Sequence, residues 1–162
     1  MSKYRLLRDA VSAVSNVELQ EAPAATDTQI LLAHTPRYLQ AVIRGELSAK
    51  EQREIGFPWS PEMVERSRRS VGATLAACAA AGVDGISVNL AGGTHHAYRD
   101  RGSGFCVFND AAIAAKVLQK VIELMLHALQ GPFFFNEIDF LLFYTCIIVG
   151  YFCFELNSFI RF

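Results

Sequence analysis

Apolar residues recur at helical spacing through most of the first half of this chain. Within residues 3–14, the apolar positions Tyr4, Leu7, Val11 and Val14 fall on one face of a helix. The same spacing, bounded by helix start and stop signals, predicts further helices over residues 26–32, 36–44, 48–55 and 61–81.

Local signals mark where these helices begin and end. A capping residue stands before four of them: Thr26, Thr35, Ser48 and Ser60. Its side-chain oxygen accepts a backbone N–H that has no partner within the first helical turn. A glycine is expected to close three of them: Gly45, Gly56 and Gly82. Glycine suits this place because it adopts the left-handed conformation without steric cost.

Residues 86–90 break the helical spacing. They read Ile-Ser-Val-Asn-Leu, an alternation of apolar and polar side chains that predicts a buried β-strand. A glycine-rich loop follows over residues 92–104, and Asn109 or Asp110 is expected to open a helix that runs to about Gln130. Helices around a buried strand indicate an α/β layered fold. Such folds usually carry their chemistry in the loop after a strand, here residues 92–104.

Two adjacent histidines, His95 and His96, occupy this loop. Histidine titrates near neutral pH and its neutral ring nitrogen binds metals, so the pair suggests proton transfer or metal binding. The alternative is that both are ordinary loop histidines, and for a His-His pair alone the two interpretations have about equal weight. The loop from Gly92 to Gly104 contains four glycines, and we expect it to be mobile without downstream packing.

The histidines lie within a longer composite motif. It reads Gly-Gly-Thr-His-His-Ala at residues 92–97 and Gly-Phe-Cys-Val-Phe-Asn-Asp at residues 104–110. Upstream stand His-Thr-Pro-Arg-Tyr-Leu at residues 34–39 and Ile-Gly-Phe-Pro-Trp-Ser-Pro at residues 55–61. Together these segments resemble the zinc-dependent deacetylases, the family of histone deacetylases, acetylpolyamine amidohydrolases and acetoin-utilisation proteins. The resemblance covers residues 1–120 and is nearest to the small bacterial-type members, which are also found in plants.

This resemblance implies a fold and a reaction. The fold is the arginase/deacetylase-like three-layer α/β fold, a parallel sheet flanked by helices, of which residues 1–120 would form the N-terminal part. The reaction is zinc-dependent removal of an acetyl group from an acetylated protein or a small acetylated amine. By resemblance His95 and His96 are the catalytic pair, with the identity of the base left open. Gly104 and Phe105 match substrate-binding positions, a carbonyl that meets the acylated amide and a wall of the acyl channel.

The resemblance ends near residue 120. In the family the zinc ligands lie further along the chain, in an Asp-x-Asp-x-His segment and a later Asp, and no such arrangement follows here. Residues 121–162 match nothing in the family, and from residue 132 onward they are rich in Phe and contain no Ala. We interpret this apolar tail as the product of a retained intron or a frameshift, with a genuine C-terminal element as the alternative.

Three functional hypotheses follow from the missing ligands. In the first, which we favour, the chain is a non-catalytic truncated form that has no metal ligands of its own and binds no zinc. In the second, it is a non-enzymatic binding or regulatory module that docks through its apolar tail. In the third, it is an active hydrolase with rearranged ligands, drawn from His95, His96, Glu123 and His127.

The charge and cysteine content of the chain limit its possible partners and its cellular compartment. The net charge is −1 without a basic run, which argues against direct binding of nucleic acid. The four cysteines show no paired spacing and the N-terminus has no signal-like apolar stretch, so we predict a cytoplasmic protein, or a nuclear one from a eukaryotic source. As a helix, the uncharged residues 140–154 would span about 22 Å, less than the roughly 30 Å of a bilayer core, so membrane contact by the tail is not favoured.

Overall fold

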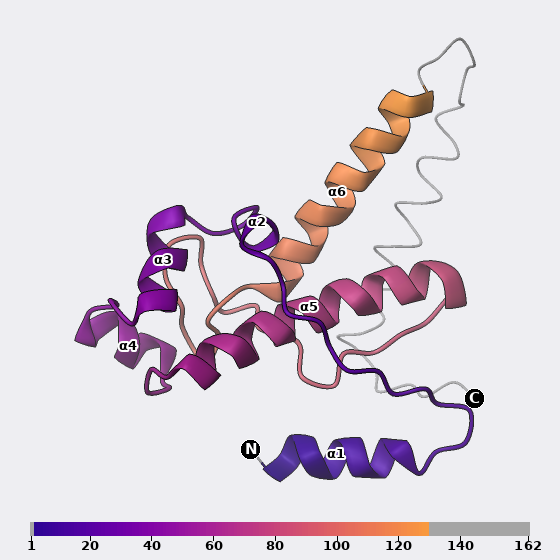
Figure 1. Ribbon diagram of the computed structural model, residues 1–162, viewed down its shortest axis with the longest axis horizontal. Coiled ribbons are helices and arrows are strands. Elements are labelled where there is room, and N and C mark those ends of the chain that lie inside the picture. The colour runs from indigo at the N-terminus through magenta and orange to yellow at the C-terminus, as the bar shows by residue number, and fades with distance from the viewer. Residues whose placement is uncertain (1, 130–162) are drawn as a thin grey trace. The chain divides into compact units, whose positions relative to one another are not determined.

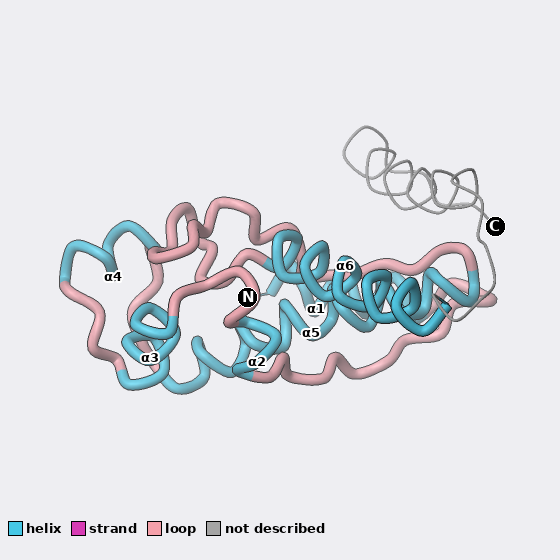
Figure 2. Tube along the Cα trace, turned by 90° about the horizontal axis from the view of Figure 1, so that it is seen from above, coloured by secondary structure: helices cyan, strands magenta, loops and turns pink. Residues whose placement is uncertain are grey.

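The computed structural model describes residues 2–129, and in this part of the chain it contains helices and loops but no strand (Figures 1 and 2). The helices are α1 (Ser2–Ser12), α2 (Asp27–Ile30), α3 (Pro36–Arg44), α4 (Ala49–Ile55), α5 (Pro61–Asp84) and α6 (Asp110–Leu129). No helix within residues 2–129 is long and apolar enough to cross a membrane. The apolar run at residues 140–154 lies outside the described residues.

The local start signals act as the sequence predicts. Thr26 and Ser48 each form a capping box at the start of α2 and α4. The side chain of Thr35 accepts the N–H of Tyr38 at 3.3 Å, and proline occupies the first turn of α3. Gly45 and Gly56 close α3 and α4 in the left-handed region, with φ of 72° and 85°. These boundaries depend on neighbours in sequence, which is why the sequence was sufficient to find them.

The predicted end of α5 at Gly82 is wrong. The helix continues to Asp84, and Gly85 caps it with a φ of 83°. A glycine inside a helix costs only about 1 kcal/mol relative to alanine, so it does not by itself stop the helix. Gly82 keeps helical geometry, whereas Gly85 takes the left-handed conformation in which its N–H donates to the carbonyl of Ala81.

The apolar face predicted for α1 is not buried. Tyr4, Leu7 and Val14 are 38%, 43% and 37% exposed, and the helix ends at Ser12, ahead of Val14. Helical periodicity shows which residues share a face, but it does not show whether another element packs against that face. In the described part of the chain, the apolar face of α1 stays exposed.

The strand predicted at residues 86–90 does not form. The segment is irregular, and Ile86 and Val88 are 60% and 53% exposed. A strand is stabilised by hydrogen bonds to a neighbouring strand, and the described residues include none to pair with it. The parallel sheet of the expected three-layer fold is therefore absent from residues 2–129.

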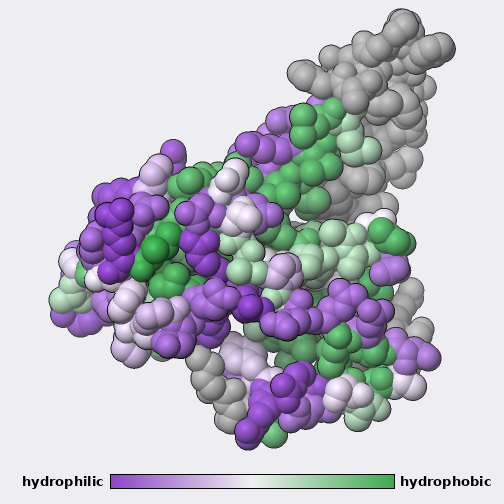
Figure 3. Space-filling model, viewed as in Figure 1, coloured by the Kyte–Doolittle hydropathy of each residue, from purple (hydrophilic) through white to green (hydrophobic). Residues whose placement is uncertain are grey.

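The alanine-rich C-terminal half of α5, directly before residues 86–90, also presents an apolar surface (Figure 3).

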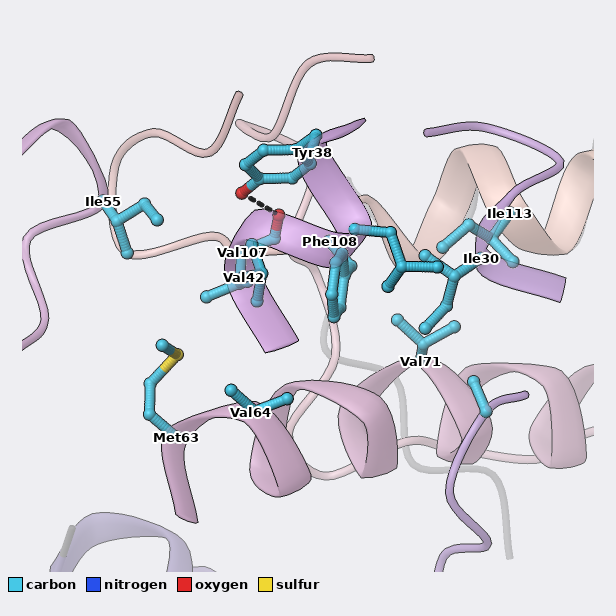
Figure 4. Close-up of a cluster of buried hydrophobic side chains, with 12 residues drawn as sticks. Ile30, Tyr38, Val42, Ile55, Met63, Val64, Val71, Val107, Phe108 and Ile113 are labelled. Atoms are coloured by element: carbon cyan, nitrogen blue, oxygen red, sulfur yellow. Dashed lines mark hydrogen bonds between the residues drawn. The ribbon is translucent and has the colours of Figure 1, made fainter. Parts of the chain in front are cut away.

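A buried core lies in the first of two units, which spans Met1–Lys120. It collects apolar side chains from α2 to α6 and from the end of the motif (Figure 4): Ala25, Ile30, Tyr38, Leu39, Val42, Ile55, Met63, Val64, Val71, Val107, Phe108 and Ile113. The Tyr38 hydroxyl donates to the carbonyl of Val107 at 2.8 Å, and burial raises the pKa of that hydroxyl. Residues 107–108 are thereby anchored directly ahead of α6.

An extended segment before α2 crosses α5 at Gly72. The N–H of Ala25 donates to the carbonyl of Arg68 at 3.0 Å. A Cβ at Gly72 would lie 1.9 Å from the carbonyl oxygen of Pro23, so only glycine allows the two backbones to approach this closely. The crossing fixes the N-terminal half of α5 against the core, and Val71 is fully buried there.

Candidate functional site

His95 and His96 lie side by side on an exposed loop between α5 and α6. Their ring centroids are 4.3 Å apart with an interplanar angle of 43°, and both side chains are open to solvent. Both imidazoles are therefore available to a ligand on the outer side of the loop. Because neither is buried, whatever order they have comes from the backbone that carries them.

Asn109 holds the histidine loop from the side of α6. Its side-chain oxygen accepts the N–H of Ala112 at 2.9 Å, which makes Asn109 the N-cap of the helix. Its side-chain amide donates to the carbonyls of His95 at 3.2 Å and Ala97 at 2.9 Å. One residue therefore starts α6 and binds the backbone on both sides of His96.

Asp110 holds the preceding turn. Its carboxylate accepts the N–H of Gly93 at 2.9 Å and the N–H of Thr94 at 2.8 Å. In return the Thr94 hydroxyl accepts the N–H of Asp110 at 3.2 Å. Asp110 is only 2% exposed, so these bonds are shielded from water. The loop expected to be mobile is thus tied to the first turn of α6.

His34 supports the same structure from the core side. It is 3% exposed, and its Nε2 accepts the backbone N–H of Asn109 at 2.9 Å, so the proton of the neutral ring sits on Nδ1. Burial lowers the pKa of His34, and the nearby carbonyls of Arg99 and Tyr98 oppose that shift without either reaching hydrogen-bond geometry with Nδ1. A buried neutral histidine that accepts from the cap of α6 has a structural role.

Gly104 and Phe105 form a tight turn that docks on the C-terminal end of α4. Their N–H groups donate to the carbonyls of Glu54 at 3.0 Å and Ile55 at 2.8 Å. Both residues have positive φ, 54° for Gly104 and 65° for Phe105. A Cβ on Gly104 would lie 3.3 Å from Cβ and Cγ of His96, so the glycine permits the turn to pass close to the second histidine. The structure therefore brings Gly104 beside His96.

The Phe105 ring projects outward from this turn. It is 64% exposed and meets the ring of Phe57 edge-on, with centroids 5.2 Å apart. The guanidinium of Arg66 lies 4.3 Å from the centroid of Phe57 on the same aromatic cluster. The next residue, Cys106, is buried, and burial raises the pKa of its thiol, so it acts as a small packed side chain and not as a reactive thiolate.

The described residues contain no group of three or more His, Cys, Asp or Glu side chains that could hold a metal ion. His95 and His96 are two donors, whereas zinc in proteins takes three or four. Of the other ligands proposed for a rearranged site, Glu123 belongs to the second unit and the side chain of His127 lies outside the described part. The described part of the chain thus does not fit zinc by itself.

Comparison with known proteins decides the family. The model of the histone deacetylase domain matches residues 2–126. The chain belongs to the histone deacetylase family. It is 37% identical over 150 residues to an uncharacterized protein of Picosynechococcus, covering 86% of this chain and 50% of that one. It is 35% identical over 127 residues to the acetoin utilization protein AcuC of Bacillus subtilis, covering 72% and 33%.

Solved structures of the family share the fold. The chain is similar to an HDAC homolog complexed with SAHA, with a TM-score of 0.60 and 32% identity over 74% of this chain and 35% of that one. The HD domain of HDA15 has a TM-score of 0.58 at 20% identity, a likeness of fold alone. This likeness implies the α/β deacetylase-like fold of these relatives, although residues 2–129 contain no strand. The chain spans about half or less of the length of these relatives.

Sequence reasoning found the histidines and the Gly-Phe turn but missed how they are held. Asn109 and Asp110 were expected only to cap a helix, and their bonds to the histidine loop were not foreseen. The available signal was the motif itself, because it contains an Asn-Asp pair close behind the histidines. An asparagine amide can donate to loop carbonyls, and an aspartate carboxylate can accept loop N–H groups. The catalytic roles of His95 and His96 and the substrate-binding roles of Gly104 and Phe105 stay predictions.

Proposed function

We propose that this chain carries the histidine part of a zinc-dependent deacetylase site and does not itself complete a metal centre or hydrolyse an acetyl amide. The observation that carries the proposal is the adjacent, exposed pair His95 and His96, held within the family motif by Asn109 and Asp110. In the described residues this pair is not joined by a third ligand-type side chain.

The residues present suit the protein side of an acetyl-amide reaction. Exposed imidazoles such as those of His95 and His96 can hold or pass a proton beside a reacting carbonyl. Gly104 lies beside His96 and has no side chain to keep a substrate amide from its backbone. The exposed ring of Phe105 offers an apolar face for the methylenes of an acyl-lysine or a small acetylated amine. Zinc, when bound, would supply Lewis-acid activation of the acetyl carbonyl, but the donors in the described part of the chain are too few to hold it.

Zinc content and turnover test this proposal together. Purified chain is expected to hold much less than one zinc per molecule and to release no acetate from an acetyl-lysine reporter above the rate of the His95→Ala, His96→Ala double variant. Elemental analysis that finds one tightly held zinc per chain, with turnover abolished by a chelator, would overturn the proposal and favour rearranged ligands.

The compartment that suits this chain is a reducing one. Cys78 is half-buried and Cys106 is buried, and neither forms a disulfide in the described residues. We therefore place the protein in the cytoplasm, or in the nucleus if the source is eukaryotic. Measurement of free thiols on the purified, denatured chain without added reductant checks this: all four cysteines of the sequence, Cys78 and Cys106 among them, are expected to react.

A further inference from the structure

Four donors converge on the buried carboxylate of Asp110. Oδ1 accepts the N–H groups of Thr94 at 2.8 Å and Ala111 at 2.9 Å. Oδ2 accepts the N–H of Gly93 at 2.9 Å and the Thr74 hydroxyl at 2.7 Å. Backbone N–H groups satisfy a buried carboxylate well because hydrogen bonds to an ionised acceptor are stronger than neutral ones. The carboxylate thus links α5, the histidine loop and α6.

The Thr74 contact is fixed by two further groups, the Ser70 carbonyl of α5 and the side chain of Asn89 in the segment after α5. A hydroxyl has one hydrogen to donate, and its distance of 2.7 Å to Asp110 is shorter than its 3.3 Å to the carbonyl of Ser70. The two hydrogens of the Asn89 amide go to Thr74 Oγ1 at 2.8 Å and to the Ser70 carbonyl at 2.9 Å. Each of these polar groups is satisfied, so the network leaves the carboxylate a single arrangement.

The glycine pair of the motif makes room for this carboxylate. A Cβ on Gly92 would lie 3.0 Å from Asp110 Oδ2 and 2.8 Å from the Asn89 amide nitrogen. Gly93 has a φ of 83°, a conformation that other residues rarely adopt. The two glycines therefore let consecutive backbone N–H groups turn toward Asp110. Thr94, the last residue of this turn, is followed directly by His95.

We propose that Asp110 is the positioning residue of the histidine pair. It fixes the turn that leads into His95 and His96, while Asn109 fixes the carbonyls of His95 and Ala97 behind them. In the described part of the chain, Asp110 forms no hydrogen bond with either imidazole. It therefore acts through the backbone of Gly93 and Thr94. The proposal rests on the proposed function only in taking His95 and His96 as the working pair, and its test reads their arrangement without zinc or turnover.

Asp110→Asn in the full chain is the central variant. The amide keeps one acceptor oxygen and turns an NH2 toward groups that are themselves donors, so it cannot satisfy Gly93, Thr94 and Thr74 together. Amide hydrogen exchange at Gly93 and Thr94, followed by NMR, is expected to accelerate at least about tenfold, as loss of a hydrogen bond to a charged group implies. The ring-to-ring NOE between His95 and His96 is expected to weaken or disappear.

Two controls separate positioning from general loss of stability. Asp100→Asn makes the same chemical change at an exposed carboxylate in the same loop, whose ion pair with Arg101 is 3.6 Å long, and it should leave both readouts unchanged. Val71→Ala weakens the core without touching the loop, so it should preserve the His95–His96 NOE while lowering global stability. An Asp110→Asn protein that folds and matches Asp100→Asn in both readouts would overturn the proposal.

If Asp110→Asn does not fold, Thr74→Val decides the matter. Valine keeps the shape of threonine and removes the donor to Oδ2, together with the acceptor of one Asn89 amide hydrogen. Exchange at Gly93, whose N–H shares that oxygen, is expected to rise by a few-fold while exchange within α3 stays constant; no change at Gly93 would contradict the proposal. Zinc uptake or turnover by the unmodified chain would overturn the proposed function. It would not change the expected amide exchange at Gly93 and Thr94 or the expected His95–His96 NOE, which test the role of Asp110.

Discussion

The histidine loop and the segment just before it belong to the same matched region of the family, yet they are held in different ways. Residues 93–97 are bound by the side chains of Asn109 and Asp110 at the start of α6. Residues 86–88 form no backbone–backbone hydrogen bond within the described part of the chain, and their apolar side chains are exposed. A loop can be organised by a few polar side chains nearby, whereas a strand needs another strand.

The contrast has a basis in the core. Val107 and Phe108 are buried directly ahead of Asn109, so the start of α6 is anchored before it meets the loop. Residues 86–88 have no such anchor within the described part of the chain, and Val83, close to the end of α5, is 86% exposed. Stability should therefore be concentrated around the motif and low around residues 83–88, and variants on the two sides should differ in the size and sign of their effect on the free energy of unfolding.

The largest effect is expected from Phe108→Ala. Phe108 is 1% exposed and its ring packs against His34 and Tyr38, with centroids 5.5 and 6.2 Å away. Its removal leaves a cavity beneath the cap of α6 and should lower the free energy of unfolding by about 3–5 kcal/mol. Phe105→Ala, in the same motif but exposed, should cost at most about 1 kcal/mol, the worth of one aromatic contact. Urea unfolding of both variants measures the difference; equal losses would remove the contrast.

Two glycines in α5 should respond in opposite directions to alanine. Gly72→Ala forces a Cβ against the backbone of Pro23, so the crossing segment must move, at a cost of about 1–3 kcal/mol. Gly82→Ala meets no atom within 4 Å and should stabilise the helix by about 0.5–1 kcal/mol. Thermal unfolding of the matched pair tests this, and destabilisation by Gly82→Ala would show that the end of α5 is covered in solution.

The pH dependence of stability should report on His34. Its folded pKa is lowered by burial, so below the unfolded value of about 6.5 the unfolded chain binds a proton that the folded chain does not. Stability should be full above that pH and fall as the pH decreases toward the folded pKa, with a slope of at most about 1.4 kcal/mol per pH unit for one proton. The His34→Gln variant should lack this slope between pH 7 and 5 in urea unfolding.

The carboxyl of Glu51 does not contribute to the pH dependence of stability between pH 7 and 5. The Ser48 hydroxyl and Arg37 lower the pKa of its carboxyl to about 2, so its stabilising contribution is lost only as the pH falls below its ordinary value of 4.5. A stability loss that begins above pH 5 in the unmodified chain and persists in His34→Gln would assign the effect to other groups and contradict the role given to His34.

The smallest effects are expected at the exposed residues on both sides of the comparison. His95→Ala, His96→Ala and Ile86→Lys should each change the free energy of unfolding by less than about 0.5 kcal/mol, as at other exposed positions. Ile86→Lys should nevertheless raise the soluble fraction on expression, because a charge on an unpaired, apolar segment opposes association between copies. A large stability loss in either histidine variant would mean that the imidazoles are themselves part of the packing.

What the sequence determined by itself was local. Thr35 and Ser48 correctly predicted where α3 and α4 begin, and Gly45 and Gly56 correctly predicted where they end. Each of these boundaries depends on atoms within one turn of the chain. The family motif likewise singled out His95, His96, Gly104 and Phe105 from residue types alone. Side-chain oxygens and glycine backbones act over a few residues, so their effect can be predicted without knowing what lies across the molecule.

The tertiary structure decided the features that join distant residues. Residues 86–90 have the composition of a strand, but strand formation needs a partner that the described residues do not contain. Asp110 was expected to cap a helix, and its bonds to Gly93, Thr94 and Thr74 required three segments to meet. The error at Gly82 is different, because no distant residue is involved: Gly82 keeps helical geometry, and Gly85 is the glycine that takes the positive φ and ends the helix. Non-local contacts carry no signature in the spacing of residues, and they are where structure adds to sequence.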